Sequence, residues 1–249
     1  MARANDSRKV GLARALSKLG VCSRSRAAEM IRAGRVRLNG ATRRDPEMPV
    51  HLGRDRIEVE RNHIFLKAYI YIVLNKPRGV IATASDEKGR QTVYALLDSK
   101  LPWLGPVGRL DKASEGLLLF TNDSEWAARI SDPASHLDKT YHVQVRACPN
   151  EIHVSELVEG VVDRGELLRA KSARILRAGE KNTWLEIVLD EGRNRQIRRL
   201  LKHFGIEVVR LVRVAIGPLA VGSLAKGSSR TLTPSEKAAL DLALARSRN

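Results

Sequence analysis

Strand patterns outnumber helical patterns from Tyr69 onward, and this feature narrows the possible folds more than any other. Segments such as "YIYIVLNK", "GLLLFT", "KTYHVQVR" and "TWLEIVL" are rich in β-branched and apolar residues, or alternate between apolar and polar ones, as strands do. Helical patterns occur at 124–131, where Ser124 is the expected cap, at 149–160 and 194–205, and at 233–247, where Thr233 and Glu236 predict a capping box. They do not follow each strand in turn. This order predicts an α+β fold, a mostly antiparallel mixed sheet flanked by helices, rather than a doubly wound parallel sheet.

The first 60 residues predict a small separate unit. Leucines at helical spacing over 12–19 indicate one helix, and "CSRSRAAEMIRAG" indicates a second helix capped by Ser23 or Ser25. "VRLNG" follows as a strand, and its Asn39-Gly40 is typical of a tight hairpin turn. Four arginines of this unit are left to face outward, where they are candidate RNA contacts: Arg24, Arg26, Arg32 and Arg35.

The charge of the chain is large and unevenly distributed. The 249 residues have a net charge of +16, and the first 61 hold 15 Lys/Arg against 7 Asp/Glu, half of that excess. Such a composition indicates nucleic-acid binding. One alternative is a basic face that only keeps the protein soluble. Another is binding to an anionic membrane surface, which is disfavoured because the basic helix is short and lacks bulky aromatics on its apolar face. Aromatic residues are only 4%, which favours a folded RNA or DNA over a stacked single strand.

Several common chemistries lack their sequence motifs. The chain has no Walker-A loop, GxGxxG, HExxH or CxxC pattern, and no Gly-rich turn of the methyltransferase kind after its first strand. No two of the six histidines have metal-ligand spacing.

The two cysteines, Cys22 and Cys148, stand in unrelated contexts, which predicts a reducing cytosol without disulfides. No apolar run approaches the roughly 20 residues that a membrane-spanning helix needs.

Asp111 is the candidate for chemistry that remains. It stands in "GRLDKASEG", a glycine-flanked loop that leads into the apolar run of residues 117–120. A carboxylate repels a phosphate-rich partner, so its presence in a basic protein calls for a reason, and nucleophilic catalysis is one. The alternative is an ordinary polar turn in which Asp111 pairs with Arg109 or Lys112, and the spacing alone leaves both interpretations open.

Longer motifs extend the argument. Residues 10–57 resemble the S4 RNA-binding domain in the pattern "L…LG.CSR..A..MI..GRV..NG". "GRLDKASEGLLLFTND", "KTYHVQV" and "EGRNRQIRRL" resemble, in order, three motifs of the RsuA-type ribosomal RNA pseudouridine synthases. The resemblance spans residues 10–240, and one departure is Ser114, where the family more often has Thr.

The resemblance implies a reaction and a set of catalytic residues. Asp111 matches the nucleophile of an isomerisation that detaches uracil from ribose and rejoins it through C5, without cofactor or metal. Tyr141 matches a tyrosine that stacks on the flipped base and assists proton removal at C5, although a core-facing tyrosine on an alternating strand is the alternative. Arg198 matches the arginine that pairs with the aspartate and would keep it ionised. Whether the carboxylate attacks C1′ or removes a ribose proton to give a glycal is left open.

The remaining site predictions concern RNA contacts. Arg109 matches a position that assists base flipping or contacts the RNA backbone, and Lys76, in "LNKPRGV", is expected to touch RNA. Basic residues of the 194–205 helix region are expected to face phosphates: Arg193, Arg195 and Arg199. Lys112 is expected to be an exposed charge without a catalytic role.

The expected organisation is an S4-like domain at 1–60 and a pseudouridine synthase domain at 68–249. The expected partner is ribosomal RNA or an assembling ribosomal subunit, the large subunit rather than the small one, and the expected protein is a cytoplasmic monomer without membrane contact. A non-catalytic ribosome assembly factor that keeps an idle site is the alternative function.

Overall fold

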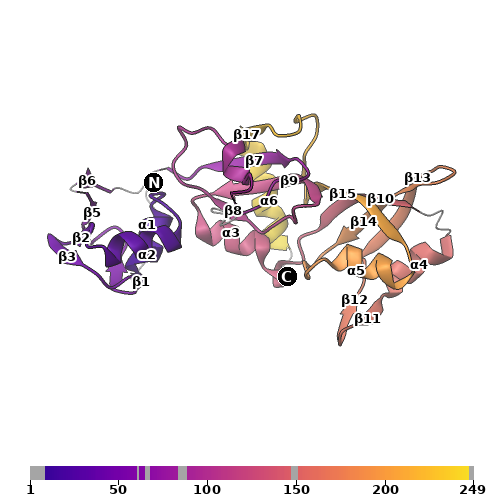
Figure 1. Ribbon diagram of the computed structural model, residues 1–249, viewed down its shortest axis with the longest axis horizontal. Coiled ribbons are helices and arrows are strands. Elements are labelled where there is room, and N and C mark those ends of the chain that lie inside the picture. The colour runs from indigo at the N-terminus through magenta and orange to yellow at the C-terminus, as the bar shows by residue number, and fades with distance from the viewer. Residues whose placement is uncertain (1–8, 61, 65–67, 84–88, 147–150, 247–249) are drawn as a thin grey trace. The chain divides into compact units, whose positions relative to one another are not determined.

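The computed structural model describes residues 9–60, 62–64, 68–83, 89–146 and 151–246 (Figure 1). The chain forms two compact units. The first comprises Met1–Ile70, Asp98–Gly105 and Phe120–Ser124; the second comprises Tyr71–Leu97, Pro106–Leu119 and Glu125–Asn249. The predicted domain boundaries at residues 60 and 68 stay predictions. No helix in the described part of the chain is long and apolar enough to cross a membrane.

The first unit has the predicted order of helix, turn, helix and strand. Its elements are β1 (Lys9–Gly11), α1 (Leu12–Lys18), α2 (Arg24–Arg32), β2 (Val36–Leu38), β3 (Ala41–Arg43), β4 (Pro49–His51), β5 (Ile57–Val59) and β6 (Asn62–His63). The Ser23 side chain accepts a hydrogen bond from the backbone N–H of Arg26, which confirms the predicted cap. Asn39 and Gly40 both have positive φ, 52° and 82°, as a tight β2–β3 turn requires.

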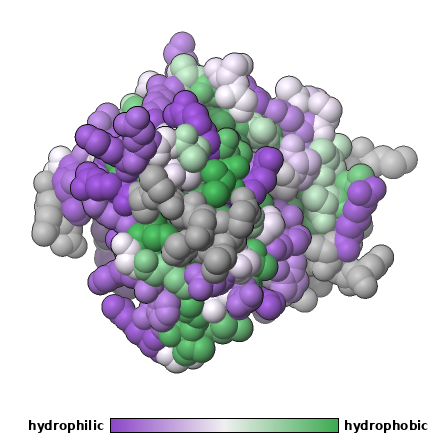
Figure 2. Space-filling model, turned by 90° about the vertical axis from the view of Figure 1, so that its right-hand side faces the viewer, coloured by the Kyte–Doolittle hydropathy of each residue, from purple (hydrophilic) through white to green (hydrophobic). Residues whose placement is uncertain are grey.

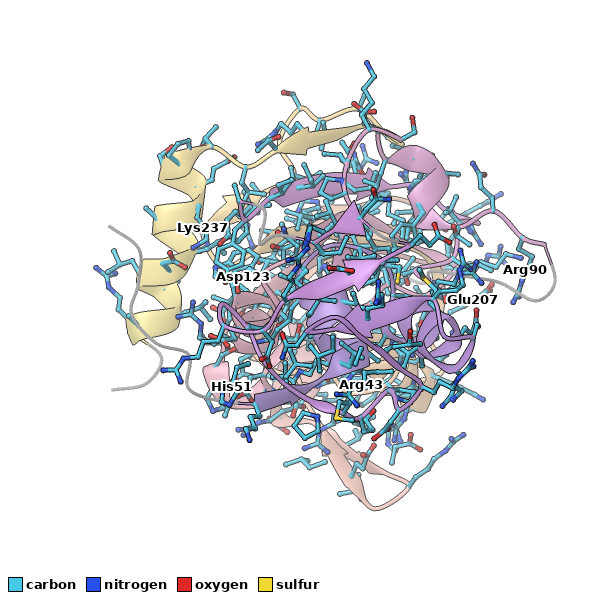
Figure 3. The ribbon with its side chains drawn as sticks, turned by 90° about the vertical axis from the view of Figure 1, so that its left-hand side faces the viewer. Arg43, His51, Arg90, Asp123, Glu207 and Lys237 are labelled. Atoms are coloured by element: carbon cyan, nitrogen blue, oxygen red, sulfur yellow. The ribbon has the colours of Figure 1, made fainter. Side chains whose placement is uncertain are left out.

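A small apolar core holds this unit together. The α1 and α2 helices bury Leu12, Leu16 and Ile31 against strand residues such as Val36 and Ile57. The four outward arginines of the prediction are all exposed, although Arg26 pairs with Glu29 and Arg35 with Glu60. Of the residues that Figure 3 labels, Arg43 and His51 lie on β3 and β4 of this unit, and both are half-buried. The unit therefore buries most of its leucines and presents most of its arginines to solvent.

The second unit is built on one mixed sheet, as predicted. In the described part of the chain its main strand order is β13-β14-β10-β15-β9-β7-β17, with β16 beside β15 and β8 beside β9. The strands are β7 (Tyr71–Lys76), β8 (Gly105–Val107), β9 (Ser114–Thr121), β10 (Lys139–Arg146), β13 (Ser172–Ala178), β14 (Thr183–Leu189), β15 (Glu207–Ile216), β16 (Leu219–Ala220) and β17 (Ser229–Thr231). The β15–β9 pair is parallel, whereas β10 pairs antiparallel with both β14 and β15.

Helices cover this sheet in two groups, and each group has its own core. The helices are α3 (Ser124–Ser131), α4 (Glu151–Glu159), α5 (Gln196–His203) and α6 (Pro234–Arg246), with short 3-10 turns η1 (Val93–Leu96) and η2 (Pro133–Ser135) and a β11 (Val161–Asp163)–β12 (Glu166–Leu168) hairpin. The α5 helix packs on β10, β14 and β15 through Ile197, Leu200 and Leu201. The α3 and α6 helices pack on β7 and β9, through Trp126 and Leu240 among others.

Two predicted helix starts have different outcomes. Thr233 and Glu236 form the expected capping box, in which each side chain accepts from the other residue's backbone N–H at 3.2 and 2.8 Å. The predicted cap at Ser124 is wrong. Ser124 is the first residue of α3, and none of the described groups hydrogen-bonds to its buried Oγ.

On the face shown in Figure 2, hydrophilic residues alternate with smaller hydrophobic areas. Lys237, labelled in Figure 3, lies 4.8 Å from the ring centre of Tyr71 and pairs with Asp241 of its own helix. Asp241 also accepts from the buried indole of Trp126, so α6 is fixed to the sheet by polar as well as apolar contacts.

Gly116 explains how β9 and β15 approach each other. Its φ is +101°, and a Cβ added at this position would lie 2.2 Å from the carbonyl oxygen of Arg213. Only glycine satisfies both conditions. The second glycine of "GRLDKASEG" is thus required by the parallel pair directly after the Asp111 loop.

Candidate active site

A cavity of about 300 Å³ lies in the second unit, beside the Asp111 loop. Its lining comes from the loop after β8, the start of β10, the segment that leads into α5, and β15. The predicted catalytic and RNA-contacting residues among its lining are Arg109, Asp111, Tyr141, Arg193, Arg195 and Arg198. The cavity is at the lower end of the size range of small-molecule sites. Residues 30 to 90 positions apart in the sequence therefore meet at one place.

Asp111 is accessible and has one arginine in contact. Its carboxylate is 41% exposed and lies 3.4 Å from Nη1 of Arg195. The predicted partner was Arg198, so this expectation is corrected: in this structure the described ion pair of Asp111 is with Arg195. Arg195 has a left-handed backbone, φ 49°, directly before α5, which turns its side chain back toward the loop. Arg195 was expected to face phosphates instead.

Arg198 lies behind the loop rather than on the carboxylate. Its guanidinium donates to the carbonyl of Ala113 at 3.4 Å and to that of Val208 at 3.3 Å. Burial lowers the pKa of Arg198, as do the nearby charges of Arg195 and Arg78, while Asp111 opposes the shift. The position of Arg198 one turn into α5 directs it at the loop backbone. Arg198 is therefore close enough to act electrostatically on Asp111 without touching it.

Lys76 is not an RNA contact, because it is fully buried. Its ammonium donates to the carbonyls of Pro77, Asp111 and Ser114, at 3.1, 3.2 and 2.8 Å. Burial lowers its pKa to about 8, against the opposing influence of Glu115 and Asp111. Lys76 thus fixes the backbone on both sides of the Asp111 loop. The sequence prediction failed here because a lysine beside Pro-Arg-Gly is far more often solvated than buried.

Tyr141 faces the cavity from β10, and its neighbour across the sheet is Arg213. Thr140 pairs with Ala215 but Tyr141 pairs with Arg213, so Val214 is an extra residue in β15. A bulge of this kind redirects side chains, and it allows both Arg213 and Ile216 to line the cavity although they are three residues apart. Its side chain is half-buried and also packs against the core beneath α5, so the core-facing alternative describes one of the two contacts of Tyr141.

The other predicted RNA contacts differ from one another. Arg109 is exposed at the cavity, and Arg193 is exposed there with its Nε on Glu191 at 2.9 Å. Arg199 is only 16% exposed, and it pairs with Asp163 and Glu166 of the β11–β12 hairpin at 2.5 and 2.7 Å. Its role is to fasten that hairpin to α5, which corrects the expectation that it faces phosphates. Lys112 is exposed, as predicted.

Sequence reasoning missed several polar residues of the cavity, and three of them have defined positions in it. Lys139 and Arg213 line it from β10 and β15, and the buried Gln196 bridges Glu191, the carbonyl of Arg169 and the N–H of Arg193. Lys139 shares its strand face with Tyr141, and Arg213 shares its face with the buried Leu211. A charged residue at the inward position of an alternating strand was the signal that could have found both.

Two family models match the chain. Residues 70–203 match the model described as RNA pseudouridylate synthase, which covers the cavity except for its β15 wall. Residues 10–57 match the S4 domain.

Individual proteins are similar over almost the whole chain. Ribosomal large subunit pseudouridine synthase B of Bacillus subtilis is 36% identical over 227 residues, which are 90% of this chain and 93% of the relative. An uncharacterized RNA pseudouridine synthase of Mycobacterium bovis is 36% identical over 95% of this chain. The crystal structure of a pseudouridylate synthase superposes with a TM-score of 0.66 and 30% identity, covering 93% of this chain and 99% of that one.

Proposed function

The chain belongs to the RsuA-type branch of the RNA pseudouridylate synthase family, and from that premise we propose that it isomerises one uridine of ribosomal RNA with Asp111 as nucleophile. The observation that carries this proposal is the exposed Asp111 carboxylate at a cavity that Tyr141 also lines. The loop that bears Asp111 is held from behind by Lys76 and Arg198. A nucleophile must be held in a fixed position by the residues around it.

The proposed reaction conserves every atom of the substrate. The target uridine leaves the RNA stack and enters the cavity, since a stacked base does not present its C1′ to the protein. The bond between N1 and C1′ breaks, and its electron pair stays with the uracil. An Asp111 oxygen bonds to C1′, or takes the C2′ proton in the glycal route. C5 of the turned uracil then bonds to C1′. In the nucleophilic route this step releases the Asp111 carboxylate. In the glycal route C2′ regains its proton from Asp111, which becomes ionised again. C5 loses its proton, and N1 gains one.

Four of the predicted cavity residues have further roles in this proposal. Tyr141 stacks on the flipped base and assists removal of the C5 proton. Arg195 contacts Asp111 in this structure, and its exposed guanidinium binds a phosphate of the RNA. Arg198 remains beside the loop and keeps Asp111 ionised. Arg109 occupies the space that the flipped base leaves or holds the adjacent phosphate.

The proposed target is the large-subunit RNA. Its support is the Bacillus relative, whose name specifies the ribosomal large subunit. The S4 unit contributes affinity for the same RNA through its exposed arginines. We also propose that the protein acts as a monomer in the cytoplasm, where ribosomal RNA is made, and that the two units divide at residues 60 to 68.

The test is pseudouridine mapping of ribosomal RNA after incubation with the purified protein. Wild type is expected to convert one uridine of 23S rRNA, and Asp111→Asn to convert none while binding the RNA equally well. Conversion of a 16S uridine would refute the choice of subunit only. Undiminished conversion by Asp111→Asn would refute the nucleophile, and absence of conversion by wild type on both free RNA and assembling subunits would favour a non-catalytic assembly factor.

A further inference from the structure

Two cations of adjacent strands line the cavity with little exposure to solvent, Arg213 on β15 and Lys139 on β10, and the reaction proposed above does not use them. Arg213 is only 6% exposed, and its Nε donates to the carbonyl of Leu117 at 2.8 Å. Its Nη2 is buried, and none of the described residues accepts a hydrogen bond from it. A buried donor without an acceptor costs free energy. Such a group in a cavity wall indicates that the acceptor belongs to a ligand.

Lys139 is the second cation. Among the described residues, its ammonium makes only a long contact, 3.3 Å, to the carbonyl of Asp190. Burial lowers the pKa of Lys139, and the positive charge of Arg213 lowers it further, against Asp190 and Asp138. Those two carboxylates are already engaged, Asp138 by Lys171 at 2.8 Å and Asp190 by His136 at 3.3 Å. Two positive charges thus share one space, and no described carboxylate contacts either of them.

The position of the pair decides which anion it suits. An RNA phosphate has chain on both sides, so it fits the mouth of a cavity, where Arg109, Arg193 and Arg195 are exposed. The inner wall is reached only by a group at the end of a branch, and in RNA that group is the base. A cavity of about 300 Å³ holds little more than one nucleotide. Intact uracil is neutral, but uracil detached from ribose is an anion.

We propose that Arg213 and Lys139 bind the carbonyl oxygens of the detached uracil and stabilise its negative charge. When the N1–C1′ bond breaks, the electron pair left on N1 spreads to O2 and O4. Both routes to bond breakage generate this anion, so the inference rests on the proposed function but not on the choice between nucleophile and glycal. Donors aimed at charge that develops during the reaction lower the barrier more than they strengthen substrate binding.

The same pair suits the rotation of the base. Half a turn about the line through N3 and C6 brings C5 to the position of N1, and it exchanges O2 with O4. A receptor of two cations therefore meets a carbonyl oxygen before and after the turn. Arg213 and Lys139 can hold the anion in the cavity while C5 approaches C1′.

The experiment measures single-turnover formation of pseudouridine at saturating RNA. Arg213→Gln is expected to lower the rate about 100-fold, as loss of one donor to a developing oxyanion does, and Lys139→Gln about tenfold. RNA affinity is expected to stay within about twofold, because neither residue meets a phosphate. Arg177→Gln, an exposed arginine on β13, is the matched control and should leave both quantities unchanged.

A second substrate separates charge stabilisation from a structural role. Fluorine at C5 withdraws electrons, so detached 5-fluorouracil is a more stable anion and needs the cations less. With 5-fluorouridine at the target position, the loss of the N-glycosidic bond should slow only about tenfold in Arg213→Gln. An equal loss on both substrates would mean that Arg213 only supports Leu117, and would overturn the proposal.

Other outcomes are equally decisive. Undiminished rates in both variants would overturn the inference, and so would weaker binding with a lower salt dependence and an unchanged rate, which identifies a phosphate site. If Arg213→Gln fails to fold in a thermal unfolding scan, Lys139→Gln on both substrates carries the test. Failure of the function itself appears differently, as a wild-type protein that makes no pseudouridine.

Discussion

Positive charge is arranged in two ways in the two units of this protein. In the first unit most arginines are exposed, and two of them pair with exposed carboxylates, Arg26 with Glu29 and Arg35 with Glu60. Around the Asp111 loop, Lys76, Arg198 and Arg213 are buried or half-buried and donate to backbone carbonyls of residues 111 to 117. Basic residues are therefore available to bind RNA phosphates in the first unit, whereas around the Asp111 loop they fix the backbone. Substitutions that remove single charges should separate these two uses.

The largest expected effect distinguishes Arg198 from Arg195. Arg198→Gln should lower the single-turnover rate between about 100- and 1000-fold, because a buried charge beside Asp111 is lost. Arg195→Gln should lower it less than about tenfold, since its contact with Asp111 is long and half exposed. Single-turnover assays at saturating RNA measure both. A greater loss for Arg195→Gln would identify Arg195, which contacts Asp111 in this structure, as the catalytic arginine.

Lys76→Met tests whether a buried cation holds the loop. Three carbonyls lose their donor, so the free energy of unfolding should fall by about 3 kcal/mol. Urea unfolding measures the change. The matched control is Arg24→Met on the exposed face of α2, which should change stability by no more than about 0.5 kcal/mol. An equal fall in the free energy of unfolding for both variants would mean that the buried Lys76 and the exposed Arg24 stabilise the protein alike, and the two units would not differ in their use of charge.

The pKa of Lys76 predicts how stability depends on pH. Its folded value of about 8 lies below its ordinary value of 10.5, so between these values the unfolded chain binds the proton and the folded protein does not. Stability therefore rises with pH in this window, by about 2 kcal/mol from pH about 7.5 to about 9.5. Lys76→Met should lack this contribution. A wild-type slope no steeper than that of the variant would contradict the burial of an ionisable lysine.

Much of the fold was predictable because its signals are local. The α3 helix has the predicted bounds, Ser124–Ser131, and the β10 strand covers the predicted residues Lys139–Arg146. The capping box at Thr233 and the Asn39-Gly40 turn are also encoded within four residues. The mixed sheet followed from the irregular order of strands and helices. The strand order, and the parallel β9–β15 pair that Gly116 permits, depend on contacts about 100 residues apart.

The site was predictable in its members but not in their contacts. The motif around Asp111, with Tyr141 and the segment before α5, identified one cavity. Lys76 was misjudged because burial of a lysine depends on three carbonyls supplied by distant segments. Arg195 and Arg198 differ by less than one helical turn, and only the left-handed backbone at Arg195 decides which one reaches Asp111. The bulge at Val214, which brings Ile216 to the same cavity as Arg213, is indicated by no sequence pattern.

The smallest expected effect concerns the first unit. Arg24 and Arg32 are exposed, and no described side chain pairs with either, so Arg24→Gln with Arg32→Gln removes two charges without exposing a buried partner. If both contact phosphates, the slope of log affinity against log salt should fall by about one per residue. The single-turnover rate at saturating RNA should stay unchanged. Filter binding at several salt concentrations measures the slope, and Arg177→Gln is the control in the other unit. A lower rate with an unchanged slope would mean that the exposed arginines act on the chemical step. The exposed charges of the first unit and the buried charges near Asp111 would then have the same function.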